Sequence, residues 1–427
     1  MLFAEDFLHY LWKLRLFNQL DLKTTAGETL EILSPGIHNK HAGPDFENAK
    51  IRIGKTLWAG NVEIHLNSSD WLRHNHQQDK AYDNVILHVV NQHDKSVLRT
   101  NGTEIPTLEL KDLIPAHIAF NYEQLMQGLN WIPCEKQIIY ADDFIVKSWL
   151  SRVLVERLEE KSALVNTALK EYKGSWDDAF YITLARNFGF KVNALPFELL
   201  ARSLPQTLLA KHKNNSLQIE ALIFGQAGFL DGDVMDNYTK QLQKEYQFLN
   251  KKYKLTSVDR YLWKYSRLRP QNFPTMRLAQ FSALVLKSNH LFSKILEIKD
   301  VKQIKLLFSD LPINSYWNNH YRFDTETTNA TSQLGEESIN NILINTVSLF
   351  LFAFGKNTGN STYVNRAVAL QEYLPAENNQ IINKFKELGV EAEKSFASQA
   401  LLQLKKQYCD QKKCLHCAIG IKILNQK

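Results

Sequence analysis

The chain has 427 residues, of which 44% are hydrophobic and 22% charged, and these proportions exclude a predominantly disordered protein. Its formal net charge of +6 is a mild basic excess that permits an anionic partner without requiring one, because an excess of this size often serves only solubility. Neither a signal peptide nor an apolar run of membrane-spanning length is recognised, so we expect a soluble, cytoplasmic protein without a membrane partner.

The first predicted element is an amphipathic helix over residues 3–18, where apolar side chains recur at helical spacing. A strand with alternating side chains is predicted at residues 29–33, where it ends in a Ser-Pro-Gly turn. Residues 37–43 show no periodicity and are predicted to form a loop. Because this loop carries Lys40 and His41 toward the next strand, it is placed to contact a phosphate or a metal, and a solvated polar loop explains it equally well.

A twisted hairpin is predicted next, because residues 49–53 and 62–66 each alternate between apolar and polar side chains and glycine pairs separate them. Side chains alternate faces along a strand, which places Glu63 and His65 side by side on one face. When the hairpin folds Asp45 back beside the second strand, two carboxylates and an imidazole meet. Oxygen-rich sites of this kind suit Mg²⁺ or Mn²⁺, and such an ion activates water for phosphodiester hydrolysis.

A helix over about residues 70–79 follows the hairpin, since a Ser-Ser-Asp segment provides a cap. On such a helix the imidazoles of His74 and His76 diverge by roughly 200°, so only one of them is expected to reach the site. Residues 84–90 are nearly all apolar and predict an interior strand. A short strand near residues 107–110 is predicted to close the domain.

Histidine is concentrated in this first part of the chain. Eight of the 13 histidines lie within the first 93 residues: His9, His38, His41, His65, His74, His76, His88 and His93. A titratable, metal-capable residue gathered around two carboxylates indicates a functional site rather than a scaffold.

Beyond a boundary near residue 132 the pattern changes to amphipathic helices, the first of which opens at Asp142 and Asp143. We therefore predict two domains. The first is an α/β domain over residues 1–132 with a mixed sheet flanked by helices, and the second is an all-α region over residues 133–427 that ends in a cysteine-rich, metal-binding tail. No fixed-period repeat requires a solenoid.

Three arginines, Arg267, Arg269 and Arg277, lie among aromatic residues and prolines in the helical region. Arginine with interleaved aromatic residues suits contacts with phosphate and bases. A proline-braced connection whose arginines cap helix ends explains the same segment, and short basic motifs are common, so we favour this structural explanation.

The C-terminal tail holds three of the four cysteines, Cys409, Cys414 and Cys417, whereas Cys134 lies at the domain boundary. Four thiolates satisfy a tetrahedral Zn²⁺ ion or an iron–sulfur cluster, and His416 is an alternative to Cys134 as the fourth ligand. Four reduced thiols without a metal are the remaining alternative. This alternative is disfavoured because a cysteine cluster among polar residues is not typical of a hydrophobic core.

The dipeptide Pro44-Asp45, the hairpin and the segment Glu63-Ile64-His65 together resemble the signature of the PD-(D/E)XK nuclease superfamily. That signature is Pro-Asp, a hairpin, then an acidic residue, any residue and Lys, and His65 stands where the superfamily usually has Lys. A neutral imidazole does not replace a permanent cation beside phosphate. The order helix, strand, hairpin, helix, strand is also the superfamily's layout. The arrangement of one distant cysteine and three C-terminal cysteines resembles the cysteines that bind a metal cluster in some nucleases of this superfamily. In those nucleases the lone cysteine precedes the Pro-Asp motif, whereas here it follows.

The resemblance implies metal-dependent hydrolysis of DNA phosphodiester bonds, with RNA as an alternative partner. In this hypothesis Asp45 and Glu63 ligate Mg²⁺ or Mn²⁺, and His65 orients or deprotonates water. The candidate auxiliary residues are Lys40, His41 and His74. Two alternatives stay open: a nucleic-acid-binding protein whose nuclease fold has lost catalysis, which the missing Lys favours, and a scaffold in which both carboxylates only hydrogen-bond loops.

The whole chain is also similar to a family of uncharacterised bacterial proteins. The shared features are Gly-Pro-Asp-Phe, Val-Glu-Ile-His, an Asp-Trp pair and the cysteine-rich tail. This wider similarity implies no activity, and the sequence identifies no protein partner.

Overall fold

The computed structural model describes residues 3–233, 235–288 and 290–426, and the chain divides into two compact units. Unit 1 comprises Met1–Trp149, Leu388–Val390 and Leu404–Lys427, and unit 2 comprises Leu150–Glu387 and Glu391–Gln403. The chain therefore divides after Trp149, whereas the sequence analysis placed the boundary after residue 132. The tail with three of the cysteines belongs to the same unit as the sheet rather than to the helical one.

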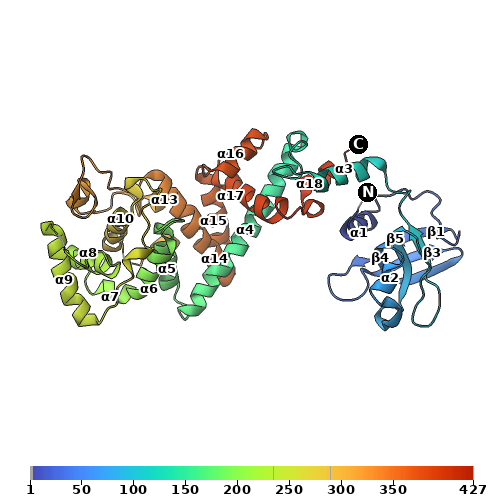
Figure 1. Ribbon diagram of the computed structural model, residues 1–427, viewed down its shortest axis with the longest axis horizontal. Helices are drawn as coiled ribbons and strands as arrows, with labels where there is room; N and C mark the ends of the chain where they lie inside the picture. Colours follow the sequence, from blue (N-terminus) through green and yellow to red (C-terminus); the bar gives the residue numbers. More distant parts are fainter. Residues whose placement is uncertain (1–2, 234, 289, 427) are drawn as a thin grey trace. The chain divides into compact units, whose positions relative to one another are not determined.

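Unit 1 is built on the mixed sheet that the sequence predicts. Its strands are β1 (Leu30–Ser34), β2 (Ile37–His38), β3 (Phe46–Ile53), β4 (Thr56–Asn67), β5 (Val85–Gln92) and β6 (Thr107–Glu109). The order is β1-β3-β4-β5-β6, with β2 also paired to β3 (Figure 1). The pairs around β3 are antiparallel, and the pairs β4–β5 and β5–β6 are parallel. The mixed sheet of unit 1 and the large helical region of the chain are thus confirmed.

The hairpin of β3 and β4 depends on two glycines. Gly54, with φ of 58°, makes the turn between the strands, a backbone conformation that glycine adopts without steric cost. Gly60 lies on β4 where β5 begins, and a Cβ atom there would lie only 2.6 Å from the carbonyl oxygen of Asn84. Close approach of β4 and β5 therefore requires glycine, and this approach fixes which residues of β5 stand beside the C-terminal half of β4.

Helix α1 (Glu5–Leu14) packs on β4 (Figure 1). Its buried face includes Phe7, Leu8 and Leu11, which are fully buried, and its first turn is acidic. Each fully buried side chain of this size contributes about 1.5–3 kcal/mol, so this face anchors the helix against the sheet. The first turn of α1 is consequently held beside the end of the hairpin that carries Asp45.

The helix predicted over residues 70–79 is much shorter, and this expectation was wrong. Helix α2 ends at Arg73 (Asp70–Arg73), and His74 is its C-terminal cap. Asn75 then adopts a left-handed conformation with φ of 61°, which Asn tolerates better than most residues, and a 3-10 turn begins at His76. The chain therefore reverses between the two histidines instead of continuing as a helix.

The sequence analysis also missed helix α3 (Ala116–Gln127) in unit 1. The side-chain Nδ2 of Asn121 on this helix donates hydrogen bonds to the backbone carbonyl oxygens of Ile423, Leu424 and Gln426. These bonds and the packing of α3 on α18 (Ala418–Leu424) hold the C-terminal tail within unit 1.

Helices form most of unit 2. Their bounds, with α4 starting at the end of unit 1, are α4 (Asp143–Glu171), α5 (Trp176–Phe188), α6 (Ala194–Ser203), α7 (Gln206–Ala210), α8 (Ser216–Gln226), α9 (Asn237–Tyr253), α10 (Pro274–Lys287), α11 (Leu291–Glu297), α12 (Val301–Leu306), α13 (Glu336–Ile342), α14 (Ser348–Thr358), α15 (Ser361–Tyr373), α16 (Gln380–Glu387) and α17 (Ser395–Leu404). A small antiparallel pair, β7 (His320–Arg322) and β8 (Thr325–Glu326), corrects the expectation that this region is entirely helical. These strands are too short to show a periodicity in the sequence.

One helix in the described part of the chain, Glu336–Thr358, is long and apolar enough to cross a membrane. Of its apolar window, 78% is buried inside the structure. A core helix of a globular protein has the same length and composition, so this helix is weak evidence for a membrane span.

Candidate metal centre

Two carboxylates of the hairpin hold each other through the backbone. The backbone N–H of Asp45 donates to Oε2 of Glu63 over 3.1 Å, and the N–H of Ile64 donates to Oδ2 of Asp45 over 2.9 Å. The structure thus brings Asp45 and Glu63 side by side. Within residues 3–233, 235–288 and 290–426, both carboxylates have histidines but no Arg or Lys as ion-pair partners.

Glu63 is buried, with 5% of its surface exposed. Burial raises the pKa of Glu63 to about 9, and the charge of Asp45 raises it further while the N–H bond from Asp45 opposes the shift. Two neighbouring carboxylates are therefore stable in the metal-free protein only when one of them holds a proton.

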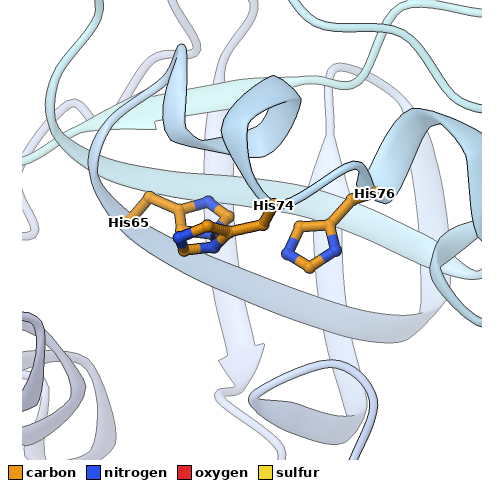
Figure 2. A group of neighbouring side chains, drawn as sticks. All are labelled: His65, His74 and His76. Atoms are coloured by element: carbon orange, nitrogen blue, oxygen red, sulfur yellow. Dashed lines mark hydrogen bonds between the residues drawn. The ribbon is translucent and has the colours of Figure 1, made fainter.

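The imidazoles of His65, His74 and His76 gather together (Figure 2). Nε2 of His76 lies 3.3 Å and Nε2 of His65 lies 3.6 Å from Oε1 of Glu63. Nε2 of His65 also lies 3.1 Å from Nδ1 of His74. One nitrogen from each of the three histidines lies within 4.8 Å of the others. The structure brings both His74 and His76 to the site because the left-handed Asn75 reverses the chain between them.

His65 is buried against β5, where its Nδ1 lies 2.9 Å from Nε2 of His88. Strand pairing places His88 opposite Glu63, so both face the same side of the sheet. Burial lowers the pKa of His65 to about 2 and that of His88 to about 3, and the neighbouring histidines lower both further. Both rings are consequently neutral at ordinary pH, which leaves nitrogen lone pairs for a metal and no positive charge for a phosphate.

Helix α1 supplies Glu5 and His9 to a second group of ligand atoms, which Asp45 completes, and these atoms also lie within 4.8 Å of one another. Nε2 of His9 lies 3.2 Å from Oδ2 of Asp45. Burial alone would lower the pKa of His9, but the hydrogen bond and charge of Asp45, together with the charges of Glu5 and Asp6, outweigh burial and raise the pKa. The sequence analysis did not select Glu5 or His9 as site residues. The only signal for His9 was the local density of histidine.

We call these residues together the His-carboxylate cluster, and its members are Glu5, His9, Asp45, Glu63, His65, His74 and His76. Their donor set fits a divalent metal ion, because Nε2 of His9 and Nε2 of His76 are buried and lie 3.2 Å and 3.3 Å from carboxylate oxygens of Asp45 and Glu63, respectively. Imidazole nitrogens beside carboxylate oxygens suit Mn²⁺ and Zn²⁺ better than Mg²⁺, which prefers oxygen alone.

In the loop before Asp45, Asn39 contacts the segment that carries Asp45, whereas the sequence analysis selected Lys40 and His41. Lys40 and His41 are exposed, and no hydrogen bond or ion pair joins their side chains to either carboxylate in the described residues. Asn39 organises the loop instead, because its side-chain amide donates to the carbonyl oxygens of Ala42 and Pro44. Its backbone N–H also donates to the carbonyl oxygen of Asp45 over 2.7 Å. Asn39 therefore positions Asp45.

The four cysteines lie together in unit 1, and none forms a disulfide. Cys134, Cys414 and Cys417 are buried, and Cys409 is partly buried. Burial raises the pKa of each thiol, and the charges of Cys414 and Cys417 raise the pKa of Cys134 further. Cys134 therefore lies within electrostatic range of the tail cysteines, although it precedes them by more than 270 residues.

We expect the metal-free protein to lose stability as the pH rises from 7 to 9. Folded Glu63 keeps its proton to about pH 9, whereas the unfolded chain releases it near pH 4.5. The folded state therefore binds more protons in this window, and the free energy of unfolding falls by at most about 1.4 kcal/mol per pH unit. The lowered pKa of His65 has the opposite effect on the pH dependence of stability. Below pH 6.5 the unfolded chain binds a proton at His65 and the folded protein does not, so the free energy of unfolding falls there as the pH is lowered.

Urea unfolding of chelator-treated protein across this pH range measures the effect. The matched variant Glu63→Gln should show a flatter profile, and added Mn²⁺ should flatten the wild-type profile. Equal slopes for wild type and Glu63→Gln would show that Glu63 does not titrate in this way.

Comparison with known proteins identifies one family. The family model described as "Protein of unknown function (DUF2851)" matches residues 5–380. No curated protein and no solved structure gives a significant match.

Proposed function

We propose that this chain, which belongs to the DUF2851 family, hydrolyses phosphodiester bonds with a divalent metal ion held by the His-carboxylate cluster. The observation that carries the proposal is the pair formed by the partly exposed Asp45 and the buried Glu63, whose carboxylates face buried imidazole nitrogens without an Arg or Lys partner in the described residues. Such a group is unfavourable without a cation, because like charges repel and unpaired buried atoms cost free energy.

The connection of the strands supports a nuclease-like activity over other metal-dependent reactions. Helix α1, strand β1, the β3–β4 hairpin, helix α2 and strand β5 follow one another in the order that the PD-(D/E)XK resemblance implies. The last pair, β4–β5, is parallel, and the pairs before it are antiparallel. Asp45 precedes the hairpin and Glu63 lies on its second strand, and the resemblance implies metal ligands at these two positions.

Each residue has a defined role in the proposed site. Asp45, Glu63 and the neutral imidazole of His76 would hold the ion, and a bound divalent metal activates water and polarises a phosphate oxygen. The exposed His74 and the partly exposed Asp45 form the accessible side of the cluster, where a phosphodiester can approach. His65 orients His74 through its Nε2 and is itself oriented by His88.

A second candidate is a nucleic-acid-binding protein with a catalytically inactive nuclease fold. The neutral state of His65 favours it, because the position that usually holds a phosphate-facing Lys carries no positive charge here. In that case metal ions change the stability of the protein and strand cleavage is absent.

A cleavage and binding experiment separates these candidates. We expect the protein to cleave linear, plasmid or single-stranded DNA in Mn²⁺ and to lose cleavage in EDTA. In EDTA it should still bind DNA, with an affinity that falls steeply as salt rises, because phosphate contacts release counterions. Fluorescence polarisation measures binding and gel electrophoresis measures cleavage. Absence of binding to DNA and RNA at low salt would exclude both candidates, and binding without cleavage would support the second.

We further propose that Cys134, Cys409, Cys414 and Cys417 hold a structural Zn²⁺ ion or an iron–sulfur cluster. The four thiols come from two distant segments, they are largely buried, and they lie within electrostatic range of one another. A metal bound to their thiolates would cross-link the tail to the Cys134 segment within unit 1.

A further inference from the structure

The helical unit contains a cavity of about 690 Å³. It is lined by residues that follow α5, by residues near the start of α10 and by residues of α13. Amide side chains line much of it: Asn193, Asn272, Asn340, Asn341, Asn378 and Asn379. A second cavity of about 550 Å³ shares Arg269 and Arg277 with the first and also contains Arg267. The three arginines that stand out in the sequence thus line two adjoining cavities.

Arg277 is buried, with 5% of its surface exposed, and its guanidinium contacts only neutral acceptors. Nη1 donates to the side-chain oxygen of Gln280 over 3.0 Å, and Nη2 donates to Oδ1 of Asn272 over 2.6 Å and to Oγ of Ser338 over 2.9 Å. No carboxylate in the described residues forms an ion pair with it. Burial lowers the pKa of Arg277 to about 10, and no acidic group opposes this shift.

A buried guanidinium of this kind is incomplete as a structural element. It has five N–H donors, of which the three bonds above use three, and the Nε atom of Arg277 is buried without a partner. A buried charge without a counter-charge costs several kcal/mol, which an anion offsets. The ring of Phe190 lies 4.5 Å from the guanidinium carbon, so a cation–π contact covers one side of this charge.

Other groups in the cavity define the rest of the ligand. The guanidinium of Arg269 is exposed and makes no hydrogen bond or ion pair within the described residues, so it is available to the same anion. Oδ1 of Asn340 is buried without a partner and needs a hydroxyl or amine donor. Of the two carboxylates in the lining, Glu337 is exposed, and Glu377 already accepts amide N–H groups, including that of Asn341.

We propose that this cavity binds an organic phosphate of nucleotide size, with its phosphate on Arg277 and Arg269 and its hydroxyl groups or base on the surrounding amides. Two guanidinium groups match the charge of a phosphate dianion better than that of a carboxylate, which carries a single charge. Each charge-assisted hydrogen bond to the phosphate strengthens its binding. A volume of about 690 Å³ is within the usual range for ligand sites. The phosphate can belong to a free nucleotide or to the end of a strand. This inference does not depend on the hydrolysis proposal.

Calorimetric titration of the full-length protein tests the proposal. The ligands are adenosine 5′-monophosphate, inorganic phosphate, a 5′-phosphorylated single-stranded oligonucleotide and, as the neutral control, adenosine. We expect the phosphorylated ligands to bind and adenosine to bind much more weakly. Arg269→Gln should weaken binding about tenfold to a hundredfold, the usual effect of losing a charge-assisted bond. Because Arg269 is exposed, this variant should fold as the wild type does.

Arg277→Met removes the buried charge, and we expect it to abolish phosphate binding while melting at the same or a higher temperature than wild type. The matched control Arg186→Gln removes an exposed ion pair with Glu198 outside the cavity and should leave binding unchanged. Binding of the mononucleotide assigns a free ligand, and binding of the oligonucleotide alone assigns a strand end; both support the proposal. Absence of binding to every phosphate, or equal binding by wild type and both cavity variants, overturns it.

Discussion

Replacing Glu63 by Gln should abolish metal-dependent hydrolysis and make the metal-free protein more stable. We expect a loss of about a thousandfold or more in rate, because a metal ion contributes several kcal/mol to the transition state and the amide removes an anionic ligand. Gln keeps an acceptor for the N–H of Asp45, so the local fold should persist. Removing the buried acid should raise the free energy of unfolding of metal-free protein by about 1–3 kcal/mol at pH 8.

A matched variant separates this effect from a general loss of negative charge. Glu47 lies on β3, two residues after Asp45, and its side chain is exposed and outside the His-carboxylate cluster. Glu47→Gln should therefore keep the wild-type rate and stability. Hydrolysis is measured with Mn²⁺ and stability by chemical denaturation in EDTA. If Glu63→Gln cleaved DNA as fast as Glu47→Gln does, Glu63 would have no role in holding the metal.

Removing the metal from the cysteine site should greatly destabilise unit 1. Structural zinc sites contribute about 10–16 kcal/mol of apparent binding free energy in small domains. Here α3 and its bonds from Asn121 also hold the tail, so we expect a smaller effect that still exceeds the few kcal/mol of an ordinary core substitution. Elemental analysis of protein purified without added metal should find zinc or iron, and stringent chelation should lower the melting temperature.

Two single variants identify the fourth ligand. Cys134→Ser should lose the metal together with its stability, whereas His416→Ala should keep both, because the charges of the tail cysteines act on Cys134. The opposite pattern would make His416 the ligand and leave Cys134 as an ordinary buried thiol. The cysteine site would be contradicted if the wild-type protein contained neither zinc nor iron and if Cys134→Ser and His416→Ala were both as stable as the wild type.

The hairpin and the position of Glu63 on it could be predicted from the sequence, because apolar and polar side chains alternate along both strands. Glu63 and His65 are two positions apart on one strand, and the glycines that shape the hairpin are visible in the chain. His88, which contacts His65 from β5, was predictable in part, since the apolar run predicts an interior strand and the nuclease resemblance implies that this strand lies next to Glu63. These features follow from a period of two residues.

His9 and His76 were not accessible in the same way. His9 reaches Asp45 only through the packing of α1 on β4, and no local pattern specifies that contact. His76 reaches Glu63 because the helix ends at Arg73 and Asn75 turns the chain. A preference of Asn for the left-handed conformation was the available signal, but helical spacing was given more weight. The buried Arg277 of the helical unit was equally unpredictable, since only the folded chain places its side chain in the interior without an acidic partner among the described residues.

Calorimetric titration of Mn²⁺ into chelator-treated, full-length protein tests whether the His-carboxylate cluster holds a divalent metal ion. We expect saturable binding to the wild type and to Glu47→Gln, and binding weakened by about a hundredfold or more in Glu63→Gln and in His76→Ala. Binding should also abolish the loss of stability between pH 7 and 9. No Mn²⁺ or Zn²⁺ binding to the wild type, or equal affinity in all four proteins, would contradict the account.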